Sequence, residues 1–185
     1  METTIRNKVI HLSKEAALIA VALVSAVLLP QIVHAIGVLA GVGGMLGQIL
    51  LPMYIPVLII GFYRGPVSGI LTGLAAPLVS FAITQMPAES ILPYITVELV
   101  AMGALAGFLS NVKLFPTLRV LAVQLGAKVM RIAIFACYLY FAGREITAAA
   151  LFGDIGRSLP GVALQLILLT VLLISKQKDR HADRA

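Results

Sequence analysis

The strongest constraint on the fold is a series of apolar segments, most of them nearly long enough to cross a lipid bilayer. A helix needs about 20 mostly apolar residues to cross the hydrocarbon core. Of the 185 residues, 60% are hydrophobic and 12% are charged. In a soluble domain roughly half of the residues are apolar and roughly a quarter are charged. Because a small soluble globule cannot bury so much apolar surface, the sequence predicts an all-α polytopic membrane protein.

Six spanning helices are expected, and they make residues 1–185 one membrane-embedded domain. The expected spans are 16–33, 52–63, 66–84, 91–109, 118–141 and 160–174. The segment 35–51, between the first two spans, is apolar and contains five glycines. Such a run makes a poor straight helix, so it predicts a re-entrant or capping loop.

The basic residues predict the orientation of these spans. With the N-terminus in the cytoplasm, ten Lys and Arg fall on the cytoplasmic side, and only Arg144 and Arg157 fall on the other. Short cytoplasmic loops are enriched in Lys and Arg. We therefore expect a protein of the bacterial inner membrane with both termini on the cytoplasmic side. The net charge of +6 is then a topology signal, and no nucleic-acid partner is expected.

Small residues recur at a spacing of four, which lets helix backbones approach closely in lipid. Gly69 and Gly73 in the third span, and Gly103 and Gly107 in the fourth, are expected to pack helices within the bundle. In the first span, docking to a separate membrane subunit is the alternative to internal packing. The residues of this candidate docking face are Ala16, Ala20, Ala22 and Ala26.

Three ionisable residues fall inside spans, where a charge is expensive and is usually paired or functional. Glu98 lies in the fourth span, and Lys128 and Arg131 lie three residues apart, on one face of the fifth. One interpretation is a structural ion pair between Glu98 and Arg131, and the other is a polar ligand site. The polar side chains expected at the same depth are His34, Gln48, Tyr54, Gln85, Tyr94, Thr96, Tyr138 and Tyr140.

The sequence lacks the motifs typical of nucleotide binding, metal binding and nucleophilic catalysis. The glycines at 41–47 are not followed by the Gly-Lys-Ser/Thr of a phosphate-binding loop. No His, Cys, Asp and Glu cluster has the spacing of metal ligands, and no nucleophile elbow occurs. We therefore expect no catalytic residue, no metal and no cofactor, and any active transport would need energy from a partner or an ion gradient.

Residues 50–69 carry an extended motif, LLPMYIPVLIIGFYRGPVSG. It continues with Gly73, Pro77-Leu78, Thr84-x-Met86-Pro87, Glu98-Leu99, Gly103 and Gly107. This region resembles the substrate-binding S components of energy-coupling factor (ECF) vitamin transporters, although Tyr54 stands where related sequences commonly carry histidine. The length, the six spans and the inside termini agree over the whole chain.

The resemblance implies a high-affinity binder of a vitamin or related micronutrient. In that family the pocket lies in the outer half of the bundle, the loop between the first two spans caps it, and small residues of the first span dock a membrane-embedded T subunit. Two ATPase subunits complete the importer. The cations Lys128 and Arg131 favour a ligand with a carboxylate or phosphate, such as pantothenate; cobalamin precursors and queuosine-type bases stay open.

Two other classes of function stay open. An autonomous channel or ion-coupled carrier would give flux in liposomes without ATPase subunits. An intramembrane enzyme or assembly factor would be distinguished by whether Glu98→Gln abolishes turnover instead of binding.

Overall fold

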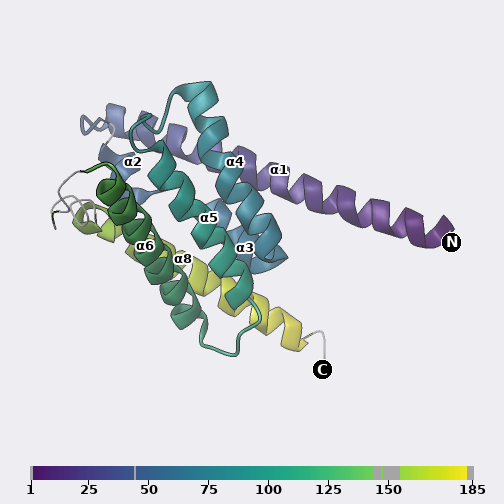
Figure 1. The fold of residues 1–185 in the computed structure, drawn as a ribbon. Coiled ribbons are helices and arrows are strands. Elements are labelled where there is room, and N and C mark those ends of the chain that lie inside the picture. The colour runs from purple at the N-terminus through teal and green to yellow at the C-terminus, as the bar shows by residue number, and fades with distance from the viewer. Residues whose placement is uncertain (1, 44, 144–146, 148–154, 183–185) are drawn as a thin grey trace.

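The computed structural model describes residues 2–43, 45–143, 147 and 155–182, and these are helical apart from short connections (Figure 1). No strand occurs in these ranges. The helices described are α1 (Glu2–Leu39), α2 (Met45–Leu50), α3 (Tyr54–Arg64), α4 (Pro66–Thr84), α5 (Leu92–Leu109), α6 (Pro116–Phe141) and α8 (Ile155–Ala182).

Five of the described helices are long and apolar enough to cross a membrane. They are α1, α4, α5, α6 and α8. Large apolar side chains lie exposed along their outer faces, for example Val21, Val24 and Leu28 on α1 and Leu71, Leu74 and Leu78 on α4. An exterior of this kind is stable in lipid and not in water, so the chain is a helical, membrane-embedded protein.

The predicted third, fourth and fifth spans agree with α4, α5 and α6 to within two residues at each end. Helix α1 is longer than the expected span 16–33. Its 38 residues correspond to about 57 Å at 1.5 Å per residue, and its N-terminal end extends beyond the other helices (Figure 1). Helix α8 likewise exceeds the expected span 160–174 at both ends.

The glycine-rich segment 35–51, expected to be a re-entrant or capping loop, is largely helical. Helix α1 continues to Leu39, and α2 begins at Met45, so the turn between them is short. Gly41 and Gly43 adopt φ values of 74° and 58° within that turn, a backbone region that favours glycine. Glycine therefore serves the turn, while the apolar residues on either side of it extend the helices.

The expected second span, 52–63, is occupied by α3, which has 11 residues. At 1.5 Å per residue this is about 17 Å, well short of the ~30 Å of a hydrocarbon core. Helix α3 is separated from α2 by a break at Leu51, which has a φ of 48°. The Leu51 carbonyl accepts a hydrogen bond from Gln165 Nε2 of α8 at 3.3 Å, so a side chain satisfies backbone that the break leaves outside a helix.

Helices α4 and α5 pack backbone against backbone. A methyl group at Gly69 would collide with the carbonyl of Gly103, and one at Gly73 would collide with the carbonyl of Leu99. Gly107 packs in the same way against Pro66 at the start of α4. The prediction that these glycines pack helices within the bundle is confirmed.

The alanines of the first span divide into two pairs. Ala16 and Ala20 are exposed, whereas Ala22 and Ala26 are buried against the chain's own helices. Helix α1 crosses α3 and α4 at this level, and the small side chains allow that close approach. Docking of this face to a separate subunit stays a prediction, and in this structure only Ala16 and Ala20 of the four alanines are exposed.

Helices α1 and α8 both contact the C-terminal end of α3, at one end of the bundle. Arg64 lies 3.3 Å from the Glu15 carboxylate of α1. The Lys176 ammonium of α8 lies 3.9 Å from the centroid of the Tyr63 ring. Because Gly107 packs against Pro66, the α5–α6 connection also lies at this end, which we name the basic end.

Candidate functional site

A cavity of about 620 Å³ lies at the end of the bundle opposite the basic end. Its wall comes from the C-terminal half of α1, α2, the start of α3, the last turn of α4 with the residues after it, the start of α5 and the middle of α6. Ser158, near the start of α8, contributes as well. Most of this wall is apolar, so the few polar side chains that reach it define where a solute could be held.

Beside the cavity, three side chains converge on the buried carboxylate of Glu98. Tyr54 donates its hydroxyl to Oε2 at 3.0 Å, Lys128 donates to Oε1 at 2.9 Å, and Arg131 donates to Oε2 at 3.2 Å. Glu98 is 0% exposed, while the Lys128 and Arg131 side chains are 14% and 26% exposed. We name these four residues the Glu98 cluster.

The local sequence explains how these side chains meet. Tyr54 is the first residue of α3, directly after the break at Leu51, so its ring projects into the end of the bundle. Lys128 and Arg131 are three residues apart on α6, so they share a face of that helix. Their convergence on Glu98 crosses three helices, α3, α5 and α6, and ties these helices together.

In the Glu98 cluster one carboxylate pairs with two cations, Lys128 and Arg131. Both carboxylate oxygens accept hydrogen bonds, which offsets the desolvation penalty of a buried charge. Its single negative charge is shared between the ammonium of Lys128 and the guanidinium of Arg131. Both cations reach the cavity wall, whereas Glu98 lies behind it.

An aromatic group lines the cavity above the cluster. The rings of Tyr94 and Phe135 meet edge to face with centroids 4.7 Å apart, and Tyr138 stacks on Phe135 at 6.4 Å. Tyr94 and Phe135 lie in the wall. Tyr138 is exposed on the outside of the bundle, so it supports this wall from behind.

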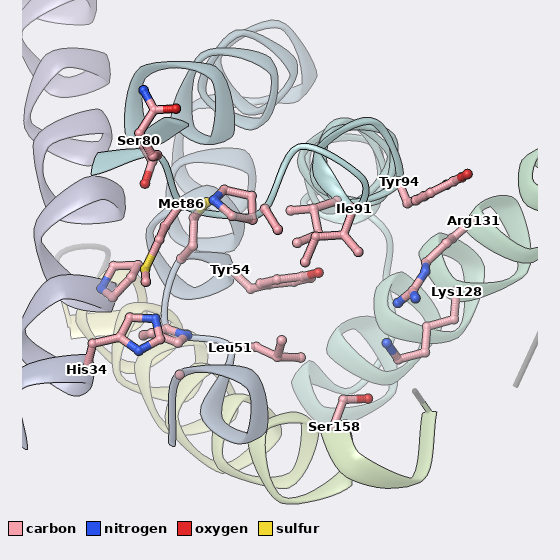
Figure 2. A pocket seen from close by; sticks show the side chains of 18 of the residues that line it. His34, Leu51, Tyr54, Ser80, Met86, Ile91, Tyr94, Lys128, Arg131 and Ser158 are labelled. Carbon is pink, nitrogen blue, oxygen red and sulfur yellow. The ribbon is translucent and has the colours of Figure 1, made fainter. Parts of the chain in front are cut away.

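On the opposite side of the cavity, α1 contributes His34. Its ring lies against the backbone of Gly47 in α2, where a methyl group would come within 2.5 Å of His34 Cε1. His34 Nδ1 is buried and has no hydrogen-bond partner among the described residues, and the same holds for Gln31 Nε2 one turn earlier. Figure 2 shows His34 on one side of the Tyr54 ring, and Lys128 and Arg131 on the other.

The structure brings most of the predicted site residues to one cavity. Its wall includes His34, Tyr54, Gln85, Tyr94, Lys128 and Arg131, with Glu98 directly behind. The side chain of Gln48 lies outside the described residues. Thr96 donates its hydroxyl to the Leu92 carbonyl of its own helix, and Tyr140 is exposed.

Sequence reasoning missed Ser80, Met86 and Ser158 in the cavity wall. Ser80 had a signal, because Ser68, Thr72 and Ser80 repeat at multiples of four residues in α4, and all three are buried. Met86 had one as well, because it belongs to the motif Thr84-x-Met86-Pro87, whereas Ser158 had none. They reach the wall because of where the chain turns after α4 and begins α8.

The fold and the cavity define a class: a helical membrane protein with a polar cluster beside a cavity at one end of its bundle. Comparison of the chain with protein-family models, with curated proteins and with solved structures gives no match.

Proposed function

We propose that this protein is the substrate-specificity component of an ECF-type importer, which binds a vitamin or related micronutrient outside the cell. Reorientation with a T subunit and ATPase subunits would then deliver the solute inward. The observation that carries the proposal is the 620 Å³ cavity with the Glu98 cluster in its wall. Small-molecule sites have this size, with mostly apolar walls and a few convergent polar groups.

Several of the residues that carry the family resemblance lie in the wall of this cavity, which supports the proposal. Pro52, Met53 and Tyr54 of the first motif lie in the wall, and so do Met86 and Pro87 of the second. Glu98, from the third part of the motif, accepts the hydrogen bond of Tyr54. These motif residues are up to 46 positions apart in sequence. A shared binding site would explain why they occur together in one motif.

The position of the cavity also supports the proposal. Arg64 and Lys176 lie at the basic end, which the distribution of Lys and Arg predicts to be cytoplasmic. The cavity at the opposite end would then face the outside. In this proposal α2, the break at Leu51 and α3 together form the second of six crossings. Gly47 of α2 and Leu51 of the break cap the cavity.

The proposal also requires partners, because the sequence contains no nucleotide-binding motif. The exposed Ala16 and Ala20 of α1 are the proposed contact with a T subunit. Small residues at this spacing suit close contact between helices in lipid.

Binding to the purified protein tests the proposal. The protein is expressed alone, purified in lipid nanodiscs, and its co-purifying small molecules are identified by mass spectrometry; vitamins are then titrated by calorimetry. We expect one of them to bind with submicromolar affinity, at one molecule per chain. A complete vitamin screen without binding would contradict the proposal, and solute flux through the protein alone in liposomes would support an autonomous carrier instead.

A further inference from the structure

The cavity has polar groups at two opposite sides and an apolar middle. Lys128 lies on α6 at one side and His34 on α1 at the other, and the Tyr54 ring lies between them (Figure 2). Apolar side chains of Leu51 and Ile91 also line the middle. A ligand that fills this space must therefore match two polar sites separated by apolar contacts.

The Lys128 side is suited to an anion. An ammonium group has three N–H donors, and within the described part of the chain only Glu98 accepts one from Lys128. The Lys128 ammonium lies in the cavity wall, where its other N–H groups can reach a ligand. An anionic group in the cavity would accept the remaining N–H donors, and such charge-assisted hydrogen bonds are about twice as strong as neutral ones.

The His34 side is suited to a neutral hydrogen-bonding group. Among the described residues, the His34 imidazole makes no hydrogen bond to another side chain or to the backbone, and leaving a polar ring nitrogen unpaired inside the bundle is unfavourable. His34 itself lies in the cavity wall. A hydroxyl, amide or ureido group of a ligand could pair with the imidazole, which presents one donor and one acceptor when neutral.

We propose that the ligand is an elongated acid: a carboxylate or phosphate group bound by Lys128, an apolar middle, and a neutral hydrogen-bonding group beside His34. This inference rests on the proposed function and specifies its substrate class. It excludes cationic solutes and neutral solutes that lack an acid group.

Matched pairs of vitamins test the acid end without changing the protein. Pantothenate and biotin are each compared by calorimetry with their neutral forms, pantothenol and biotinamide, alongside any acid vitamin found in the screen and its amide. We expect the acid to bind at least about 10-fold more tightly than its neutral form. Equal binding of the two forms overturns this inference but leaves the proposed function intact, whereas no binding of any vitamin counts against the proposed function itself.

Variants of Lys128 and His34 then test which residue binds each end of the ligand. Lys128→Gln should remove the preference for the acid, and Lys128→Arg should keep most of it because the cation is retained. His34→Phe should weaken the acid and the neutral form by a similar factor, about 5- to 10-fold, and so leave the preference unchanged. Thermal unfolding of each variant checks that it is folded. A preference that survives Lys128→Gln, or binding that is insensitive to His34→Phe, overturns the assignment.

Discussion

Glu98 is the side chain on which the polar cluster depends. Both of its oxygens accept hydrogen bonds, from donors on α3 and α6. A buried carboxylate is expensive to desolvate, and here the neighbouring donors offset that penalty. The same contacts hold the cavity-facing groups Tyr54, Lys128 and Arg131 in place, so a change at Glu98 affects both stability and binding.

Glu98→Gln should therefore lower the free energy of unfolding by about 3 kcal/mol, because two cations lose their buried counter-charge. The double variant Glu98→Gln/Lys128→Gln should be less destabilised than the sum of the two single variants, since it removes both members of the Glu98–Lys128 pair. Denaturation in detergent micelles measures both effects. Strict additivity of the two variants would show that the Lys128 pair does not form.

Tyr54 allows a sharper test of one hydrogen bond. Tyr54→Phe keeps the buried ring and removes only the hydroxyl that donates to Glu98. It should lower the free energy of unfolding by about 1 kcal/mol. Tyr138→Phe is the matched control, because the Tyr138 side chain is exposed, and it should leave stability unchanged. Equal effects of the two variants would argue against the Tyr54 bond.

At the level of elements, the close contact of α4 and α5 positions the site. The contact runs through Gly69, Gly73, Gly103 and Gly107, where backbone meets backbone. Glu98 lies on α5, one residue before Leu99, whose carbonyl approaches Gly73. The distance between α4 and α5 therefore determines the position of the Glu98 carboxylate.

Gly103→Ala should destabilise the protein by about 2 kcal/mol, because its methyl group would collide with the backbone of Gly69 and force the helices apart. Gly156→Ala in α8 is the control, since a methyl group there meets no neighbouring atom within 4 Å. It should be neutral or slightly stabilising. Denaturation in detergent compares the two, and an equally stable Gly103→Ala protein would contradict the observed packing.

For the whole molecule, the proposed function requires the cavity end to face the outside and the basic end to face the cytoplasm. Glu89 follows α4 at the cavity end, and Lys113 lies in the connection between α5 and α6 at the basic end; both are exposed. Single cysteines at these two positions report their sides of the membrane. They are introduced after Cys137→Ser, because the native Cys137 is exposed.

In intact cells, a membrane-impermeant maleimide should label Glu89→Cys and should label Lys113→Cys only after the membrane is permeabilised. This result follows from the preference of Lys and Arg for the cytoplasmic side. The reverse labelling pattern would show that the cavity faces the cytoplasm, and it would contradict the proposal that the solute is taken up from outside.

Much of the molecule could be predicted from the order of residues alone. Long apolar segments require a lipid environment and internally satisfied backbone, so helices at 66–84, 92–109 and 116–141 follow from local composition. Glycines at a spacing of four likewise predicted close helix contacts, because the absence of a side chain acts locally. Ionisable residues inside spans pointed to Glu98, Lys128 and Arg131 as a group.

Only the tertiary structure decided how these parts meet. It placed Ala22 and Ala26 inside the bundle, made part of the segment 35–51 into helix α2, and brought Ser80, Met86 and Ser158 to the cavity wall. The sequence by itself determined where the long apolar helices lie, since helix formation depends on neighbours along the chain, and which residues are ionisable, since that depends on residue type alone; it did not predict α2. The pairing of Glu98 with Tyr54, 44 residues away, depends on how whole helices cross, which no local pattern specifies.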